Sequence, residues 1–220
     1  MKLIIFDLDG TLVNAYPAVH ASINYTLKAM GFPPRCAAVI KSCVGWGDRH
    51  LLETFVGKAN GEAALKIYRR HHAGSLKTKT GVRFLPGART ILTFLKKAGY
   101  RLAVASNRPT KATILILKIL GARAYFDMVL CADKAQRPKP HPDMLIEIMR
   151  ALKVRKEETL YVGDMTIDVI TGRGARVRTV AVTTGSSTPA QLKQLKPWRV
   201  VDKMSRLKTI IGGFHEQEET

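Results

Sequence analysis

The chain has 220 residues, enough for one sizeable hydrophobic core with a small second domain. Its composition, 46% hydrophobic and 24% charged, is typical of a folded soluble protein. No apolar run approaches the ~18 residues of a membrane-spanning helix, which excludes that class. Acidic charge at Asp7 comes too early for a signal peptide, so we expect a cytoplasmic protein without membrane contact. Three cysteines without paired spacing favour neither a disulfide framework nor a zinc site.

The net charge of +19, from 36 Lys+Arg against 17 Asp+Glu, is unusually high. Such an excess attracts anionic ligands and can bind nucleic acid without sequence preference. The densest basic stretches, 66–79 and 193–208, contain no block of five like charges. We therefore favour a solvated basic surface, while a nucleic-acid partner stays open as a less favoured interpretation.

The first element is a short apolar run at 3–6, which predicts a buried strand of a parallel sheet ended by a turn at Gly10. The stretch 16–80 carries helical patterns and no convincing strand. Within it, apolar residues at helical spacing predict helices in three places: 19–30, 51–56 and 63–72. The crossings into and out of this insertion, 13–17 and 78–84, are predicted hinges.

From residue 101 onward, strands and helices alternate. The predicted strands are 101–106, 128–131, 160–163, 179–183 and 199–201, and the predicted helices are 110–120, 142–152, 167–174, 189–195 and 204–211. This alternation predicts an α/β fold, a doubly wound, Rossmann-like parallel sheet with an inserted all-helical domain. We assign residues 1–15 and 81–220 to the α/β core and 16–80 to the helical domain. The acidic tail 216–220 is expected to fray.

Polar side chains follow the predicted strands where each strand ends, and in an open parallel sheet these carboxyl ends form the binding site. The candidates are, in chain order, Asp7, Asp9, Ser106, Asn107, Lys139, Asp164 and Asp168. The carboxylates of Asp7, Asp164 and Asp168 converge, which is costly unless a cation compensates them. Oxygen ligands without His or Cys favour magnesium.

The remaining candidates suit a phosphate group. Lys139 adds a fixed positive charge, and a cation together with a lysine neutralises an incoming phosphate. The hydroxyl of Ser106 and the backbone around Asn107 can donate hydrogen bonds to the phosphate oxygens. These residues predict a site for phosphoryl chemistry.

Four motifs resemble those of the haloacid dehalogenase superfamily, in the same order and over nearly the whole chain. The motifs are Asp7-Leu8-Asp9-Gly10-Thr11, the strand-ending Ser106, Lys139-Pro140-His141-Pro142-Asp143, and Gly163-Asp164 followed by Asp168. The resemblance implies a two-step phosphoryl transfer. In the first step Asp7 attacks phosphorus and forms an aspartyl-phosphate, and Asp9 protonates the leaving oxygen. In the second step Asp9 activates water.

The resemblance also implies the magnesium ligands. These are the carboxylates of Asp7 and Asp164 and the backbone carbonyl of Asp9, with Asp168 ligating or supporting the cluster. The presence of Asp9 argues against dehalogenation, because the dehalogenases of this superfamily lack an aspartate there.

The helical insertion matches the cap domain of this superfamily in position and length. Residues 44–52 resemble the specificity loop of phosphoglycolate phosphatase-like enzymes, so Arg49 or His50 is expected to contact the substrate. Thr11 and Asn107 are further predicted substrate-binding residues. The segment 107–111 resembles the TNKP-type segment of the same group.

The leading hypothesis is a magnesium-dependent phosphatase acting on a small phosphorylated metabolite such as phosphoglycolate. A phosphomutase like β-phosphoglucomutase shares both aspartates and stays open, as does a pyrophosphatase or nucleotidase. A basic protein associated with nucleic acid is the alternative outside enzymes. Monomer and homodimer are both compatible with the sequence.

Overall fold

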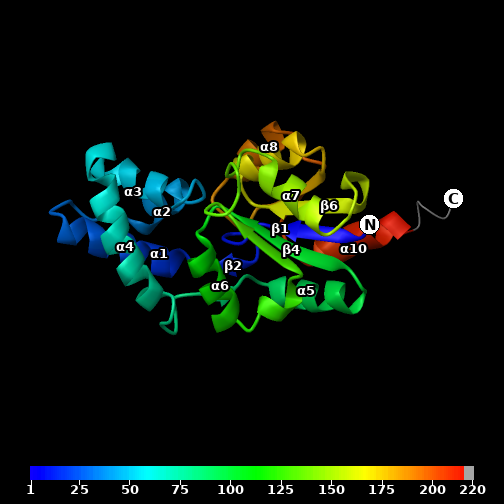
Figure 1. The fold of residues 1–220 in the computed structure, drawn as a ribbon, viewed down its shortest axis with the longest axis horizontal. Helices are drawn as coiled ribbons and strands as arrows, with labels where there is room; N and C mark the ends of the chain where they lie inside the picture. Colours follow the sequence, from blue (N-terminus) through cyan, green and yellow to red (C-terminus); the bar gives the residue numbers. More distant parts are fainter. Residues whose placement is uncertain (216–220) are drawn as a thin grey trace.

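A computed structural model describes residues 1–215, and the tail 216–220, for which fraying was expected, lies outside the described residues. Its centre is a sheet of six parallel strands in the order β5-β4-β1-β6-β7-β8 (Figure 1). The strands are β1 (Leu3–Phe6), β4 (Arg101–Ser106), β5 (Met128–Cys131), β6 (Thr159–Gly163), β7 (Arg178–Val182) and β8 (Arg199–Val201). The predicted doubly wound sheet is confirmed.

Helices cover both faces of this sheet. Side chains alternate along each strand, so the apolar residues of the strands point to both faces and need a covering layer on each. Ile4 and Phe6 of β1 pack on one face, together with α5 (Ala88–Lys97), α6 (Thr110–Ile119) and α10 (Arg206–His215). Leu3 and Ile5 point to the other face, where α7 (Asp143–Ala151) packs. The helices α8 (Thr166–Gly174) and α9 (Pro189–Gln194) pack on β7 at the same face. Both faces of the central strand are therefore buried.

The chain order creates a switch point beside β1. From β1 the chain runs outward through β4 and β5, and it then returns to the opposite side of β1 at β6. Phe6 is in register with Val104 of β4 and with Val162 of β6. The residues that follow these three strands therefore emerge next to one another, where open α/β sheets bind their ligands.

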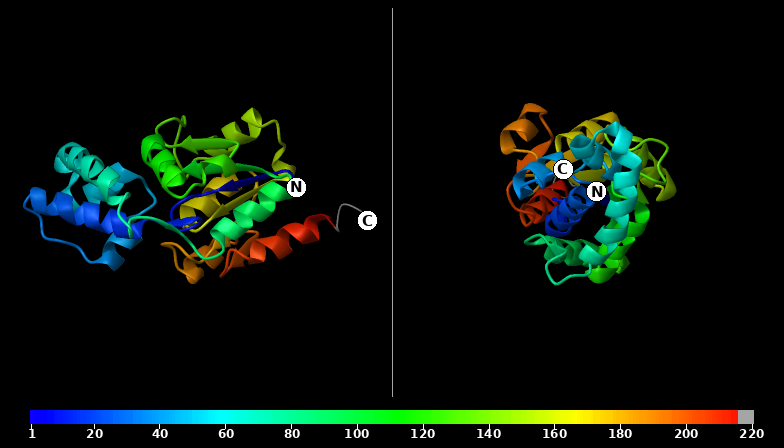
Figure 2. Two further views of the ribbon diagram at one scale, coloured as in Figure 1. Left: turned by 90° about the horizontal axis from the view of Figure 1, so that it is seen from below. Right: turned by 90° about the vertical axis from the view of Figure 1, so that its left-hand side faces the viewer.

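The insertion is helical, as predicted, and forms its own layer at the carboxyl end of the sheet (Figure 2). Its helices are α1 (Tyr16–Ala29), α2 (Ala37–Cys43), α3 (Asp48–Val56) and α4 (Gly61–Ser75). They enclose a hydrophobic cluster of their own that includes Ile23, Leu52 and Tyr68. Three short 3-10 helices lie at Lys58–Asn60, Arg123–Tyr125 and Lys156–Glu158. None of the described helices is long and apolar enough to cross a membrane.

Two strands and two helices were not predicted. The two crossings expected as hinges pair with each other, β2 (Val13–Asn14) running antiparallel to β3 (Arg83–Phe84). Two residues per strand are too few to show an alternating pattern. Helix α2 buries only Ile40 and so has no apolar stripe. Helix α5 does carry an apolar face, and this signal was overlooked.

Candidate active site

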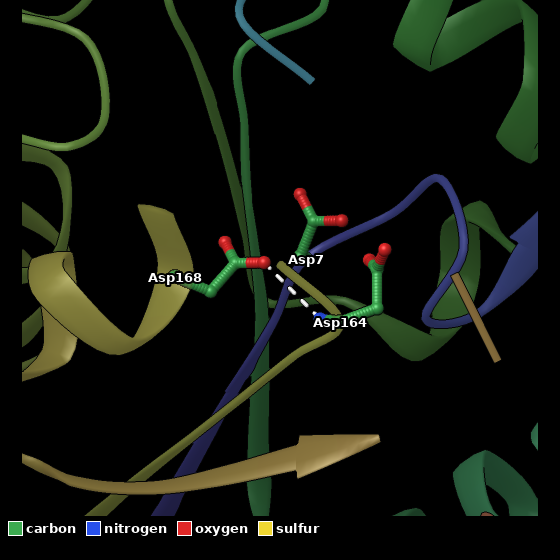
Figure 3. A group of neighbouring side chains, drawn as sticks. All are labelled: Asp7, Asp164 and Asp168. Atoms are coloured by element: carbon green, nitrogen blue, oxygen red, sulfur yellow. Dashed lines mark hydrogen bonds between the residues drawn. The ribbon is translucent and has the colours of Figure 1, made fainter. Parts of the chain in front are cut away.

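Three carboxylates converge at the carboxyl edge of the sheet (Figure 3). Asp7 directly follows β1, Asp164 directly follows β6, and Asp168 lies in the first turn of α8. The backbone N–H of Asp7 donates to the carbonyl of Val162 at 2.8 Å, which continues the pairing of β1 with β6 into the site. One oxygen from each carboxylate lies within 4.8 Å of the others, and all three residues are buried.

Lys139 reaches into this cluster from the loop after β5. Its Nζ donates to Asp7 Oδ1 at 2.6 Å, to Asp168 Oδ1 at 2.8 Å and to the hydroxyl of Tyr161 at 3.1 Å. The lysine is 3% exposed, so its charge is not screened by solvent. The structure thus brings Lys139 together with Asp7 and Asp168, as the sequence predicts.

The single ammonium does not balance the three buried carboxylates. Burial raises the pKa of Asp7 to about 7, although Lys139 opposes this shift and Asp168 adds to it. Burial, followed by repulsion from Asp7 and Asp168, raises the pKa of Asp164 well above its ordinary value. Carboxyl groups in this condition gain stability from a bound cation, which takes the place of the proton.

The surroundings of Asp164 fit a hard, hydrated cation. A Cβ at Gly185 would lie 1.6 Å from Asp164 Oδ2, and a Cβ at Gly10 would lie 2.6 Å from the same atom. A side chain at either position would therefore clash with the carboxylate of Asp164. The hydroxyls of Tyr16 and Ser186 are buried without a hydrogen-bond partner among the described residues. A set of oxygen donors with spare polar groups nearby suits magnesium.

Asp168 is held by four hydrogen bonds. Its Oδ2 accepts from the backbone N–H groups of Asp164 at 3.1 Å and Met165 at 2.9 Å. Its Oδ1 accepts from Lys139 and, at 2.6 Å, from the hydroxyl of Tyr161. These bonds occupy both oxygens and favour a supporting role, in which Asp168 fixes Lys139 and the loop carrying Asp164.

Asp9 stands apart from the three clustered carboxylates. Its Oδ2 accepts from Nε of Arg108 at 2.8 Å, and its Oδ1 accepts from Nη2 of the same residue at 3.0 Å. The third guanidinium nitrogen, Nη1, lies 2.7 Å from Nε2 of His72 in helix α4. The turn at Gly10 therefore directs the second aspartate of the first motif toward the inserted helices.

Ser106 and Asn107 lie at the end of β4, as predicted. The hydroxyl of Ser106 accepts from the backbone N–H of Arg108 at 3.2 Å. The Asn107 amide nitrogen donates at 3.0 Å to the carbonyls of Gly45 and Lys139, and its oxygen accepts from the Lys139 N–H at 2.9 Å. Asn107 thus ties a loop of the insertion to the loop that carries the lysine.

A cavity of about 480 Å³, including its open mouth, connects these groups. The residues of the strand ends and the following loops that line it are Asp7, Asp9, Ser106, Asn107, Arg108, Lys139, Met165, Ile167 and Asp168. The residues of the insertion that line it are Val19, Val44, Gly45, Gly47, Asp48, Leu51 and Tyr68.

Three predicted substrate-binding residues do not line this cavity. Thr11 is fully buried, and its hydroxyl donates to Asp164 Oδ1 at 2.9 Å, so it positions a carboxylate instead of meeting a ligand. Arg49 is exposed and pairs with Glu53 and Glu62 on the outside of the insertion. His50 is exposed as well. In this structure the three side chains lie away from the cavity, and their contact with a substrate stays a prediction.

The phase of helix α3 explains why Arg49 and His50 lie outside the cavity. The helix begins at Asp48, and residues three apart on a helix share one face. Asp48 and Leu51 line the cavity, so Arg49 and His50, which lie between them, point elsewhere. The predicted loop therefore lies at the cavity, but Asp48 and Leu51 face the cavity where Arg49 and His50 were expected.

Four residues of this site were not predicted: Arg108, His72, Asp48 and Tyr161. Arg108 had a usable signal, because it is a basic residue directly after a strand end and lies in the segment already compared with TNKP. Asp48 lies within the predicted loop 44–52, where Arg49 and His50 were singled out instead. His72 and Tyr161 carry no local signal, since each joins the site only through tertiary packing.

Comparisons with known proteins agree with this geometry. Residues 4–182 match the family model of the haloacid dehalogenase-like hydrolases. The chain is 33% identical over 186 residues to a phosphoglycolate phosphatase of Rhodobacter capsulatus, a match that covers 83% of this chain and 84% of the relative. It is 31% identical over 217 residues to the probable phosphatase IndB of Dickeya dadantii, with 97% and 93% covered.

A solved structure extends the likeness to the fold. The crystal structure of a predicted phosphoglycolate phosphatase from Haemophilus somnus superimposes with a TM-score of 0.88 at 27% identity, covering 96% of this chain and 98% of that one. The chain belongs to the haloacid dehalogenase-like hydrolases. Within this family it is a phosphatase of the phosphoglycolate phosphatase-like group.

Proposed function

We propose that this chain is a magnesium-dependent phosphatase that hydrolyses phosphoglycolate or a similarly small phosphomonoester through an aspartyl-phosphate on Asp7. The observation that carries the proposal is the buried group of Asp7, Asp164 and Lys139 after neighbouring strands. Asp7 and Lys139 line a cavity that Asp9 also lines. A nucleophile, a cation site, a fixed positive charge and a proton carrier are the parts that phosphoryl transfer needs.

The carboxylates of Asp7 and Asp164 and the backbone carbonyl of Asp9 would hold the magnesium ion. When bound, it supplies positive charge that stabilises the phosphoryl oxygens during transfer. Lys139 donates to one oxygen of Asp7 and so orients this carboxylate for attack. The ammonium of Lys139 also offsets the negative charge that the phosphate brings into the buried site.

In the first step, a carboxylate oxygen of Asp7 attacks phosphorus, and the bond from phosphorus to the alcohol oxygen breaks. The leaving oxygen takes a proton from Asp9. In the second step, Asp9 takes a proton from water, whose oxygen attacks phosphorus and releases the carboxylate of Asp7 with inorganic phosphate. The hydroxyl of Ser106 lines the cavity and can donate to a phosphoryl oxygen in both steps.

The insertion supports the choice of a small substrate. Val19, Val44, Leu51 and Tyr68 of the insertion line the cavity together with the residues of the strand ends. Residues 16–80 would thus act as a cap over a core made of residues 1–15 and 81–220. Several relatives of this chain are phosphoglycolate phosphatases, which makes phosphoglycolate the first compound to test.

The test is phosphate release from 2-phosphoglycolate and from p-nitrophenyl phosphate by the purified chain, with magnesium and after its removal by EDTA. Turnover that requires magnesium and disappears in Asp7→Asn supports the proposal. Phosphate release that is equal in the wild type and in Asp7→Asn, or that is unaffected by EDTA, contradicts it.

A further inference from the structure

Two nitrogens of the Arg108 guanidinium group, Nε and Nη2, donate hydrogen bonds to the carboxylate of Asp9. The two contacts, 2.8 and 3.0 Å, form a paired, fork-like ion pair. The side chain of Arg108 is 6% exposed and that of Asp9 is 13% exposed, so water screens this pair only weakly. Both oxygens of Asp9 are thus engaged by the same guanidinium group.

The third guanidinium nitrogen of Arg108, Nη1, contacts His72 of the insertion. Burial and the adjacent guanidinium lower the pKa of His72 to about 3, so this imidazole is neutral. Since Nε2 of His72 faces the Nη1 donor at 2.7 Å, Nε2 is the acceptor and Nδ1 carries the proton. Nδ1 then donates to the hydroxyl of Ser22 at 3.2 Å, and this hydroxyl donates to the carbonyl of Ala18. Arg108 is thus positioned from the cap.

Lys139, the other cationic side chain of the cavity, already has carboxylate partners. Among the described residues that line the cavity, the cationic side chains are Arg108 and Lys139. Lys139 donates to Asp7 and Asp168 at the end where the phosphate would bind. Arg108 lies beside Asp9, and the group that Asp9 protonates is the leaving group. A second negative charge on the substrate, located next to the leaving oxygen, would therefore meet Arg108.

Without Asp9, Arg108 would keep its contact with His72 and the nearby charge of Asp48, but Nε and Nη2 would lose their two-point partner. Buried donors without an acceptor are costly. A substrate that releases Asp9 therefore has to offer Arg108 a replacement. A carboxylate matches the planar fork of a guanidinium with two parallel hydrogen bonds, which makes it the best-fitting replacement.

We propose that Arg108 forms a carboxylate subsite, in which its guanidinium exchanges Asp9 for a carboxylate on the leaving-group side of the substrate. This inference rests on the proposed function and deepens it, because it names a phosphorylated carboxylic acid as the substrate class. A phosphomonoester that lacks the carboxylate leaves Arg108 on Asp9 and reacts slowly.

The test compares 2-phosphoglycolate with 2-phosphoglycolamide, which has nearly the same shape and no charge at this position. Wild-type kcat/KM should favour the acid by about 100-fold or more, as in sites built to hydrogen-bond a substrate group. In Arg108→Gln the preference should fall below about tenfold, with most of the loss on the acid. Arg108→Lys keeps the charge without the fork and should retain part of the preference. Arg70→Gln, which removes an exposed arginine of helix α4, is the matched control and should leave the ratio unchanged.

A binding measurement separates this inference from the proposed function. Calorimetric titration of magnesium-loaded Asp7→Asn with both compounds requires no turnover, and tighter binding of the acid that is lost in Asp7→Asn/Arg108→Gln supports the subsite. Equal binding of acid and amide by Asp7→Asn, or equal losses on both compounds in Arg108→Gln, would overturn it. If Arg108→Gln fails to fold, the wild-type ratio decides, and a ratio near one overturns the subsite. Absence of turnover together with selective binding would contradict only the proposed function.

Discussion

The two ends of the cavity are built in different ways. At the strand ends, Lys139 and Asp168 share hydrogen bonds with each other and with backbone groups of the sheet and of α8. At the cap end, the polar links to the core include Asn107 to Gly45 and Arg108 to His72. The first end is fixed by the fold, while the second depends on pairings that a ligand can exchange. The difference suggests that reaction chemistry and substrate choice reside at opposite ends.

The largest effect is expected from replacing Asp9, and it distinguishes the role of Asp9 in proton transfer from the role of the cluster in binding the cation. Asp9→Asn removes the proton carrier while leaving the side chains of the cluster in place, so kcat for 2-phosphoglycolate should fall by about 10²- to 10⁴-fold. Magnesium should still raise the melting temperature of this variant, and the loss should be smaller for p-nitrophenyl phosphate, whose leaving group needs no proton. An equal loss on both substrates would contradict the role given to Asp9.

The second prediction concerns stability at the strand ends. Lys139→Met leaves Asp7 and Asp168 without their shared buried partner, and we expect a loss of about 3–5 kcal/mol in the free energy of unfolding. Urea denaturation without magnesium measures this change. Lys134→Met, in the same loop but exposed, should change stability by less than about 0.5 kcal/mol. Similar values for the two variants would show that the lysine is not needed to balance the cluster.

The third prediction concerns the room around Asp164. In Gly185→Ala the new methyl group would lie 1.6 Å from Asp164 Oδ2, so the carboxylate has to move. Magnesium affinity, measured by calorimetry, should fall by about 10- to 100-fold, the usual effect of disturbing the support of a metal ligand. Gly74→Ala, at an open helical position, is the control and should bind magnesium like the wild type.

The fourth prediction follows from the pKa of Asp7. Its pKa is raised from 3.8 to about 7, so protons compete with magnesium below this pH. Apparent magnesium affinity should be ~30-fold weaker at pH 5.5 than at pH 8. Without magnesium, the same group lowers stability as the pH rises from 3.8 to about 7, because the unfolded chain ionises it first. Magnesium titrations of the wild type and Asp7→Asn at both pH values check this, and the pH dependence should be reduced in the variant.

The smallest effect is expected at Arg49, the cap residue that the sequence favoured. Its side chain is 55% exposed and pairs with Glu62 outside the cavity. Arg49→Ala should change kcat/KM by less than about twofold, because surface ion pairs contribute little. A loss above about tenfold would show that the cap rearranges and brings Arg49 to the substrate.

The sequence was sufficient for the strand-end residues and insufficient for the cap. Asp7, Lys139 and Asp164 follow strands whose apolar runs are visible, and parallel strands bring their carboxyl ends together without further information. The cap contacts depend on helix phase and on packing between distant segments. For this reason Asp48 lines the cavity where Arg49 was expected, and His72 had no signal at all.

The most direct test of the account is chemical trapping of the phosphorylated residue. The chain is mixed with magnesium and ³²P-labelled 2-phosphoglycolate, quenched in acid within the first turnovers, reduced with borohydride and digested for mass spectrometry. Borohydride converts an aspartyl-phosphate to homoserine, and we predict homoserine in place of Asp7 and loss of the protein-bound label in Asp7→Asn. Label on another residue, or turnover without any labelled protein, would contradict the role of Asp7 as the nucleophile.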